Sequence, residues 1–339
     1  MGSEVPLAAK VAFLRDPSHY PDRPARVEAI ETHMAWVFLT ERFAYKLKKP
    51  VRYPYLDFGT LAAREFYCRE EVRLNQRLAP GVYLGVAALN RHDGRLVLNG
   101  DGEVVDWLVS MRRLPRARMV DRMIRHRALE GRQLASLAQR LVEFYRNCVP
   151  EPLSGEAYRR RCREAVLVNL QELQRLRAFC RDLDVQRLAE LQLTFLERRA
   201  CWFDARAGEA RIVEGHGDLR PDHICFERPW PFIIDCLEFN RAFRVLDSAD
   251  ETAYLAMECA FLGYPEVGGE FLSLYDRYSG DELPPPLRWF YMTYRATLRG
   301  RLALARLREL PPDRMFHWYQ RGRRYLTLAA GYARRLGVS

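Results

Sequence analysis

The first third of the chain alternates short apolar runs with polar turns, which predicts strands around a single helix. The runs are rich in β-branched and aromatic residues, and a His-Asp-Gly turn at 92–94 joins two of them as a hairpin. Residues 60–78 instead carry apolar side chains at helical spacing, and Pro80 ends that pattern. The predicted strands cover residues 27–31, 35–40, 43–47, 83–89, 95–99 and 104–111.

From residue 116 onward the pattern changes to helical spacing of Leu, Ala and Arg. Helices are predicted over 116–126, 132–148, 156–182 and 185–203, and again over 248–262, 266–278, 286–308 and 312–336. A short β-rich stretch, 211–239, interrupts them. The sequence Ser-Ala-Asp-Glu at 248–251 fits a capping box, which predicts that a helix starts there, with Ser248 as its cap.

This order of elements predicts an α+β protein with two lobes. We expect an N-terminal helical extension over 1–24, a small β-rich lobe with one helix over 25–111, and a larger, mostly helical lobe over 112–339. The β insert at 211–239 lies within the second lobe.

Composition excludes several classes. The chain has 339 residues, of which 48% are hydrophobic and 29% charged, as in ordinary globular proteins. No run approaches 18 apolar residues, and the N-terminus lacks a signal-peptide pattern, so we expect no membrane association. The eight cysteines form no C-x-x-C pair, which favours reduced thiols in a cytoplasmic protein.

The net charge of +10 comes from arginine rather than lysine, since only 4 of the 54 basic residues are lysines. The arginines are spread along the chain near acids, which does not indicate a nucleic-acid patch. Three of the four lysines, however, fall within 44–50. Lysine is a compact point charge where arginine is a planar fork, so a narrow phosphate-binding slot would demand lysine; chance clustering on a strand is the alternative.

Two carboxylates carry the candidate chemistry. Asp218 stands in the loop His-Gly-Asp-Leu-Arg-Pro-Asp-His, residues 216–223, and Asp235 follows an apolar run seventeen residues later. Phosphoryl transfer needs two such acids, one to orient the attacking hydroxyl and one to hold Mg²⁺ on the nucleotide phosphates. For Asp235 the alternative is an ordinary turn residue.

These motifs and the order of the lobes resemble the aminoglycoside phosphotransferase family, a branch of the protein-kinase-like superfamily that includes choline and fructosamine kinases. Residues 35–40, 45–50 and 219–223 match segments found in an uncharacterised bacterial subgroup. The resemblance covers about residues 25 to 330 and implies a protein-kinase-like fold with ATP and Mg²⁺ as cofactors.

The resemblance also implies roles for the residues that bind nucleotide. Lys46 is expected to contact the α- and β-phosphates, with Glu71 as its helix partner and Glu70 as the competitor. For either glutamate the alternative is an ordinary solvated acid on the helix surface. The adenine is expected at the segment joining the lobes, 111–115, where Met111 and Arg113 are the candidate contacts.

It further implies that Asp218 is the catalytic base and Asp235 the metal ligand, while His216 braces the loop. An acid at the start of the 248–262 helix would anchor that loop, and spacing leaves Asp250 and Glu251 both open. Helix capping is the simpler interpretation of Glu251.

Two features depart from the kinase pattern. His223 stands where an Asn normally binds a second Mg²⁺, and imidazole is a poorer ligand for Mg²⁺ than oxygen. Asp222 or Glu238 could substitute; alternatively, only one metal is held firmly, or the activity is weak. Mn²⁺ would tolerate the nitrogen of His223 better. There is also no glycine between Glu31 and Lys46, so 32–35 would cover the phosphates or leave them more open.

Three hypotheses follow. The first is an ATP-dependent kinase acting on a hydroxyl of a small molecule: a sugar, an amino alcohol or a metabolite phosphate. The second is a catalytically weak or inactive kinase-like protein that binds nucleotide or regulates a partner, and the third is a basic nucleic-acid-associated protein. An aminoglycoside acceptor would need a local acid cluster, for which the candidates are Asp247, Asp250, Glu251 and Glu258. No Walker A sequence occurs, so we expect the stand-alone form of a subgroup in which a second P-loop domain can follow.

Overall fold

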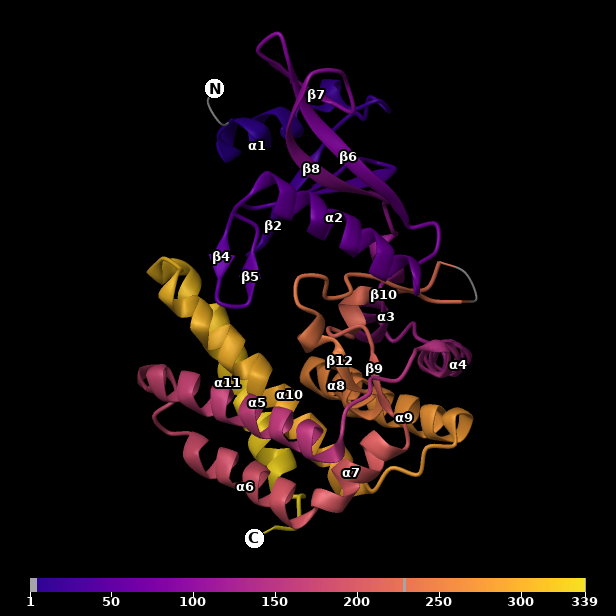
Figure 1. Ribbon diagram of the computed structural model, residues 1–339, viewed down its shortest axis with the longest axis vertical. Helices are drawn as coiled ribbons and strands as arrows, with labels where there is room; N and C mark the ends of the chain where they lie inside the picture. The colour runs from indigo at the N-terminus through magenta and orange to yellow at the C-terminus, as the bar shows by residue number, and fades with distance from the viewer. Residues whose placement is uncertain (1–4, 228–229, 339) are drawn as a thin grey trace. The chain divides into compact units, whose positions relative to one another are not determined.

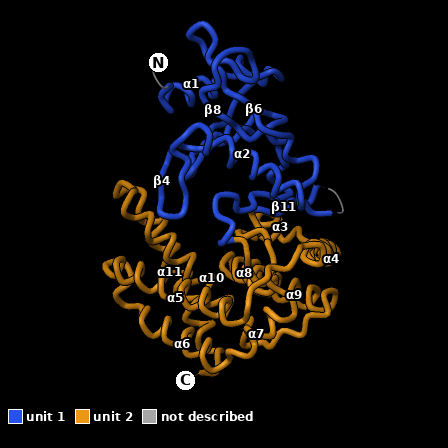
Figure 2. Tube along the Cα trace, in the orientation of Figure 1, with its two compact units in different colours: residues 1–119, 223–243 blue, residues 120–222, 244–339 orange. Residues whose placement is uncertain are grey.

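The computed structural model describes residues 5–227 and 230–338, and its chain divides into two compact units (Figure 2). Unit 1 comprises residues 1–119 and 223–243, and unit 2 comprises 120–222 and 244–339. The β hairpin after residue 222 therefore belongs to the same compact unit as the N-terminal sheet, whereas the sequence analysis placed 211–239 in the second lobe. The predicted lobe boundaries stay predictions.

Unit 1 is built on a six-stranded antiparallel sheet with the order β1-β2-β3-β8-β6-β7. Strands β2, β6, β7 and β8 of this sheet are labelled in Figure 1. Each predicted strand is present, with ends shifted by a few residues at most, because alternation between one buried and one exposed face is a strong local signal. The strands are β1 Glu28–Glu31, β2 Ala35–Leu39, β3 Phe43–Lys48, β6 Tyr83–His92, β7 Arg95–Leu98 and β8 Glu103–Arg112.

Helices α1 (Leu7–Arg15) and α2 (Leu61–Gln76) complete this unit (Figure 1). α2 packs on β6 and β8, and Thr60 caps it by accepting a hydrogen bond from the amide of Ala63 at 3.1 Å. α1 is tied to the sheet by a buried ion pair, in which Lys10 Nζ lies 2.7 Å from Asp106 Oδ2. Two short hairpins are added: β4 (Arg52–Tyr53) with β5 (Leu56–Asp57), and β10 (Ile224–Cys225) with β11 (Phe232–Ile233).

Within residues 120–222 and 244–338, unit 2 is helical apart from one antiparallel pair of short strands, β9 (Ile212–Glu214) and β12 (Val245–Asp247). α8 packs on α9 and α10, and α10 lies along α11 (Figure 1). The helices are α3 Val120–Arg125, α4 Gly131–Asn147, α5 Gly155–Arg175, α6 Val185–Arg198, α7 Ala200–Gly208, α8 Ser248–Leu262, α9 Pro265–Ser279, α10 Pro285–Ala305 and α11 Pro312–Ala333.

Four details of the helix predictions are wrong. The helix expected from residue 116 begins only at Val120, because Arg116–Arg118 form a 3₁₀ turn and Met119 is extended. The stretch 185–203 forms two helices, because the chain leaves helical geometry at Arg199, where φ is −118° and ψ is 29°. The helix expected to reach 182 ends at Arg175. α8 does start at Ser248, but its cap is Asp247, whose carboxylate accepts from the amide of Ala249 at 2.8 Å.

None of the eight cysteines forms a disulfide, and five of them are buried. In the described part of the chain, no helix combines the length and apolar character needed to cross a membrane.

Candidate functional site

Lys46 is the first residue of the candidate site in unit 1. It lies in β3, and its Nζ is 2.8 Å from Glu71 Oε1 on α2 and 2.8 Å from Asp235 Oδ1 after β11. Glu70 points elsewhere and pairs with Arg73 at 2.8 Å. Of the two glutamates that the sequence left open, Glu71 is thus the one that faces the lysine.

Lys48 extends this group, which the sequence prediction missed. Residues two apart on a strand share a face, so Lys48 points the same way as Lys46. Its Nζ lies 2.6 Å from Glu71 Oε2 and also pairs with Glu238. The result is a row of alternating charges in the order Asp235, Lys46, Glu71, Lys48 and Glu238, which we call the lysine–carboxylate row. The crowding of lysines in 44–50 was the sequence signal for it.

The pKa directions along this row differ. Burial lowers the pKa of Lys46, but Asp235 and Glu71 outweigh it and raise that pKa well above the ordinary value. Burial raises the pKa of Glu71, and the two lysines reverse this to a net lowering. For Glu238 burial prevails over Lys48, so its pKa is raised. Glu71 is therefore the firmly ionised centre of the row, and Glu238 is the member that takes up a proton more readily.

Backbone contacts fix Asp235. Its φ is 62°, a left-handed conformation that costs free energy for a residue with a side chain. Its amide donates to the Tyr83 hydroxyl at 3.0 Å, and the amide of Cys236 donates to Asn75 Oδ1 at 2.9 Å. Asn75 in turn donates to the carbonyl of Glu71 at 2.8 Å. Asn75 was recognisable from its place one helical turn after Glu71; Tyr83 carried no local signal.

His223 lies on the other side of Asp235. Its Nε2 is 3.5 Å from Asp235 Oδ2, and the Asp235 side chain is 45% exposed. Within residues 5–227 and 230–338, no three His, Cys, Asp or Glu side chains gather closely enough to form a metal centre. One exposed carboxylate beside an imidazole nevertheless fits a Mg²⁺ that arrives on a nucleotide, because such an ion takes most of its ligands from phosphate and water.

The two candidate nucleotide contacts lie at the end of β8. Met111 is the register partner of Ala44 and of Tyr83. The side chain of Arg113 is held on the sheet, where Nη1 donates to the carbonyl of Thr40 at 2.5 Å.

In unit 2 the loop of Asp218 is anchored by Glu251. The Glu251 carboxylate accepts from the amide of His216, at 2.9 and 3.0 Å, from the amide of Gly217 and from the Tyr145 hydroxyl at 2.6 Å. A Cβ at Gly215 would lie 2.5 Å from Glu251 Oε2, so only glycine fits there.

Asp250, the other acid that the sequence left open, points away from this loop. Its two oxygens accept from Arg295 at 2.8 and 2.6 Å. Glu251 is thus the residue that holds the loop, which goes beyond the helix-capping interpretation.

Asp218 itself is 28% exposed and held on both oxygens. The Tyr254 hydroxyl donates to Oδ1 at 2.7 Å, and Arg220 Nε lies 3.6 Å from Oδ2. The amide of Asp218 donates to Nδ1 of the buried His216 at 3.3 Å. Tyr254 and Arg220 thus orient the carboxylate while leaving it partly exposed.

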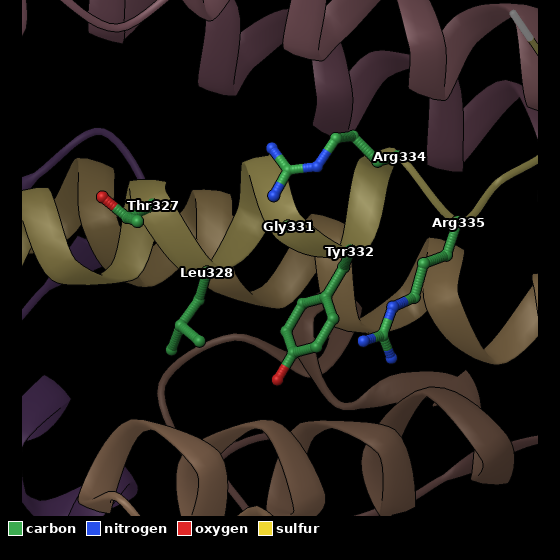
Figure 3. Close-up of a pocket in the computed structure, with 6 residues that line it drawn as sticks. All are labelled: Thr327, Leu328, Gly331, Tyr332, Arg334 and Arg335. Atoms are coloured by element: carbon green, nitrogen blue, oxygen red, sulfur yellow. The ribbon is translucent and has the colours of Figure 1, made fainter.

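A depression on the surface of α11 lies apart from these residues in the sequence (Figure 3). Tyr332 stacks on Trp289 there with 5.7 Å between ring centroids, and the Arg335 guanidinium lies 4.6 Å from the Trp289 ring. It is lined by Thr327, Leu328, Gly331, Tyr332, Arg334 and Arg335, none of which is a predicted site residue.

Comparison with solved structures identifies the fold. Wild-type aminoglycoside 2'-phosphotransferase-IIIa in its GDP complex matches 98% of this chain and 99% of its own, with a TM-score of 0.51 and 16% identity. Choline kinase from Cryptosporidium parvum matches over 96% of both chains, with a TM-score of 0.56 and 11% identity. A choline/ethanolamine kinase family protein from Mesorhizobium loti covers 97% of this chain and 100% of its own, with a TM-score of 0.53 and 12% identity. The predicted protein-kinase-like fold, of the kind found in aminoglycoside phosphotransferases, is confirmed.

Sequence comparison gives relatives in two mycobacterial species. Uncharacterized proteins of Mycobacterium tuberculosis and Mycobacterium bovis are each 35% identical over 293 residues, which is 85% of this chain. The chain spans 56% of the length of each relative. No protein-family model matches it.

Proposed function

We propose that this chain, which has the protein-kinase-like fold of aminoglycoside phosphotransferases and choline kinases, is an ATP-dependent phosphotransferase acting on a hydroxyl of a small molecule. The observation that carries the proposal is the contact of Lys46 Nζ with Glu71 and with Asp235, at 2.8 Å each. A strand lysine, a helix glutamate and a metal-binding aspartate are the parts that kinases use to hold nucleotide phosphates.

In unit 1, Lys46 would bind the α- and β-phosphates. Its ammonium faces two carboxylates, so a phosphate oxygen can replace Asp235 as a partner while Glu71 keeps the ammonium in place. Asp235 would then hold Mg²⁺, which supplies charge neutralisation on the phosphates. The backbone of 111–115 would hold the adenine, with Met111 beside it.

In unit 2, Asp218 would orient the acceptor hydroxyl and take its proton. The Tyr254 hydroxyl bond fixes the carboxylate, and the Glu251 contacts fix the loop. His216 acts as a positioning residue, because its Nδ1 must be unprotonated to accept from the amide of Asp218.

Nucleotide binding is tested first, by the melting temperature in ATP or GTP with Mg²⁺ or Mn²⁺. A ligand at 100 times its Kd stabilises by about 2.7 kcal/mol, which is a shift of several degrees. Lys46→Met should abolish the shift. Lys49→Met is the matched control, since Lys49 pairs with Glu31 at the surface. The absence of any nucleotide-dependent shift in the wild type would refute the proposal.

Phosphate transfer to a panel of hydroxylated metabolites is tested next, with Asp218→Asn as the variant. We expect a loss of about 10²- to 10⁴-fold in transfer with nucleotide stabilisation retained. Equal rates for the variant and the wild type would exclude Asp218 as the base. Nucleotide binding without turnover on any acceptor would instead support the second hypothesis, a nucleotide-binding protein whose His223 has replaced the second metal ligand.

A further inference from the structure

The acids that would suit a polycationic acceptor are already used inside unit 2. All four candidates for an acidic pocket are buried. Asp247 contacts Arg206 and Tyr291, and Asp250 contacts Arg295. Glu251 accepts hydrogen bonds from His216, Gly217 and Tyr145, and Glu258 contacts Tyr325 and Arg299. A buried carboxylate with such partners binds a ligand cation weakly, because the ligand would have to separate it from its partner and leave that partner buried without a counter-charge.

One face of α8 extends from the Asp218 loop to a group of arginines. Glu251, Tyr254, Glu258 and Phe261 follow at intervals of three, four and three residues, so they lie on the same side of the helix. Glu251 holds the loop and Tyr254 holds Asp218. With a rise of 1.5 Å per residue, Phe261 lies about 10 Å along the axis from Tyr254.

Three arginines gather around the Phe261 end of this face; we call Arg299, Arg321 and Arg324 the arginine cluster. They come from α10 and α11, which pack on α8 (Figure 1). The guanidinium of Arg324 lies 4.6 Å from the Phe261 ring and that of Arg321 lies 4.9 Å from it. Arg299 lies 5.6 Å from the ring of Tyr325, which itself stacks on Phe261 at 3.7 Å.

The arginine cluster carries more positive charge than its ion pairs with described residues neutralise. The carboxylate paired with it is that of Glu258, whose Oε1 lies 3.0 Å from Arg299 Nε. Three cations against one carboxylate leave an excess of two positive charges. Arg324 is exposed, while Arg299 and Arg321 are partly exposed. Ring stacking also holds the planar guanidinium groups in fixed orientations, which favours bidentate contacts with phosphate or carboxylate.

We propose that the acceptor is an anion, whose hydroxyl lies at Asp218 and whose phosphate or carboxylate group contacts the arginine cluster. This rests on the proposed function and narrows it, because it excludes polycations such as aminoglycosides as the preferred acceptor.

Four hexoses that differ in charge provide the test: glucose 6-phosphate, glucuronate, glucose and glucosamine. Binding is measured by calorimetry at low salt without nucleotide, so that the result does not depend on turnover. We expect the two anions to bind at least tenfold more tightly than glucose and glucosamine, and the advantage to shrink at raised salt. Whichever of the two anions binds more tightly identifies the preferred acidic group as a phosphate or a carboxylate. Equal binding of all four, or a preference for glucosamine, would overturn the proposal.

Matched variants locate the binding group. Arg324→Gln and Arg299→Lys should each weaken anion binding about tenfold. Arg323→Gln is the control on the same helix, because Arg323 pairs with Asp182 instead. Lys46→Met should leave anion binding intact. Equal affinities for Arg324→Gln and Arg323→Gln, or loss of binding in Lys46→Met, would overturn the assignment. Failure of the proposed function would show separately, as the absence of nucleotide-dependent stabilisation.

Discussion

The central carboxylate of the lysine–carboxylate row gives the sharpest prediction about stability. Glu71→Gln removes a fully buried charge that contacts Lys46 at 2.8 Å and Lys48 at 2.6 Å. Breaking one partner of a buried ion pair costs about 3–5 kcal/mol. Asp235 and Glu238 remain beside the two lysines, so we expect the lower end, about 3 kcal/mol of unfolding free energy at pH 7, measured by denaturant titration.

The pH dependence identifies the charge as the cause. The folded pKa of Glu71 lies below its ordinary value of 4.5, so its contribution is complete above that value and is lost as pH falls through the folded pKa. The gap between wild type and Glu71→Gln should therefore close on acidification. Glu70→Gln is the control, since Glu70 makes a partly exposed pair with Arg73 and should cost about 0.5 kcal/mol or less. Equal losses at the two glutamates, or a gap that does not change with pH, would refute the reasoning.

Three further predictions concern the Asp218 loop and the metal. Glu251→Gln should lower the unfolding free energy by about 2 kcal/mol and phosphate transfer by more than tenfold, because two loop amides lose a charged acceptor; calorimetric melting and initial rates measure this. Tyr254→Phe should lower kcat about tenfold while changing stability by about 1 kcal/mol or less, and an unchanged kcat would contradict the orienting role of its bond to Asp218. His223→Asn should raise the ratio of Mg²⁺- to Mn²⁺-supported transfer, since an amide oxygen suits Mg²⁺ better than imidazole does; an unchanged ratio would place His223 outside the metal site.

The sequence predicted those features that depend on neighbouring residues. The strands and α2 followed from local alternation and helical spacing, and the resemblance pointed to Lys46 and Glu71, which the structure brings together. Features that depend on tertiary packing could not be predicted from the sequence. Asp250 and Glu251 are adjacent on one helix, so spacing could not choose between them. Which of them faces the loop is decided by the packing of Arg295 and Tyr145.

The ion pairs of unit 1 show where the few lysines of this arginine-rich chain are placed. Strand alternation divides the cluster: Lys46 and Lys48 point to one face, while Lys49 pairs with Glu31 at the surface. Each of the two inward ammonium groups contacts two carboxylates at once. Lys10 is also buried, against Asp106. Two of the four lysines, Lys46 and Lys48, therefore lie between carboxylates of unit 1, and the proposed exchange of Asp235 for a phosphate oxygen at Lys46 depends on this arrangement.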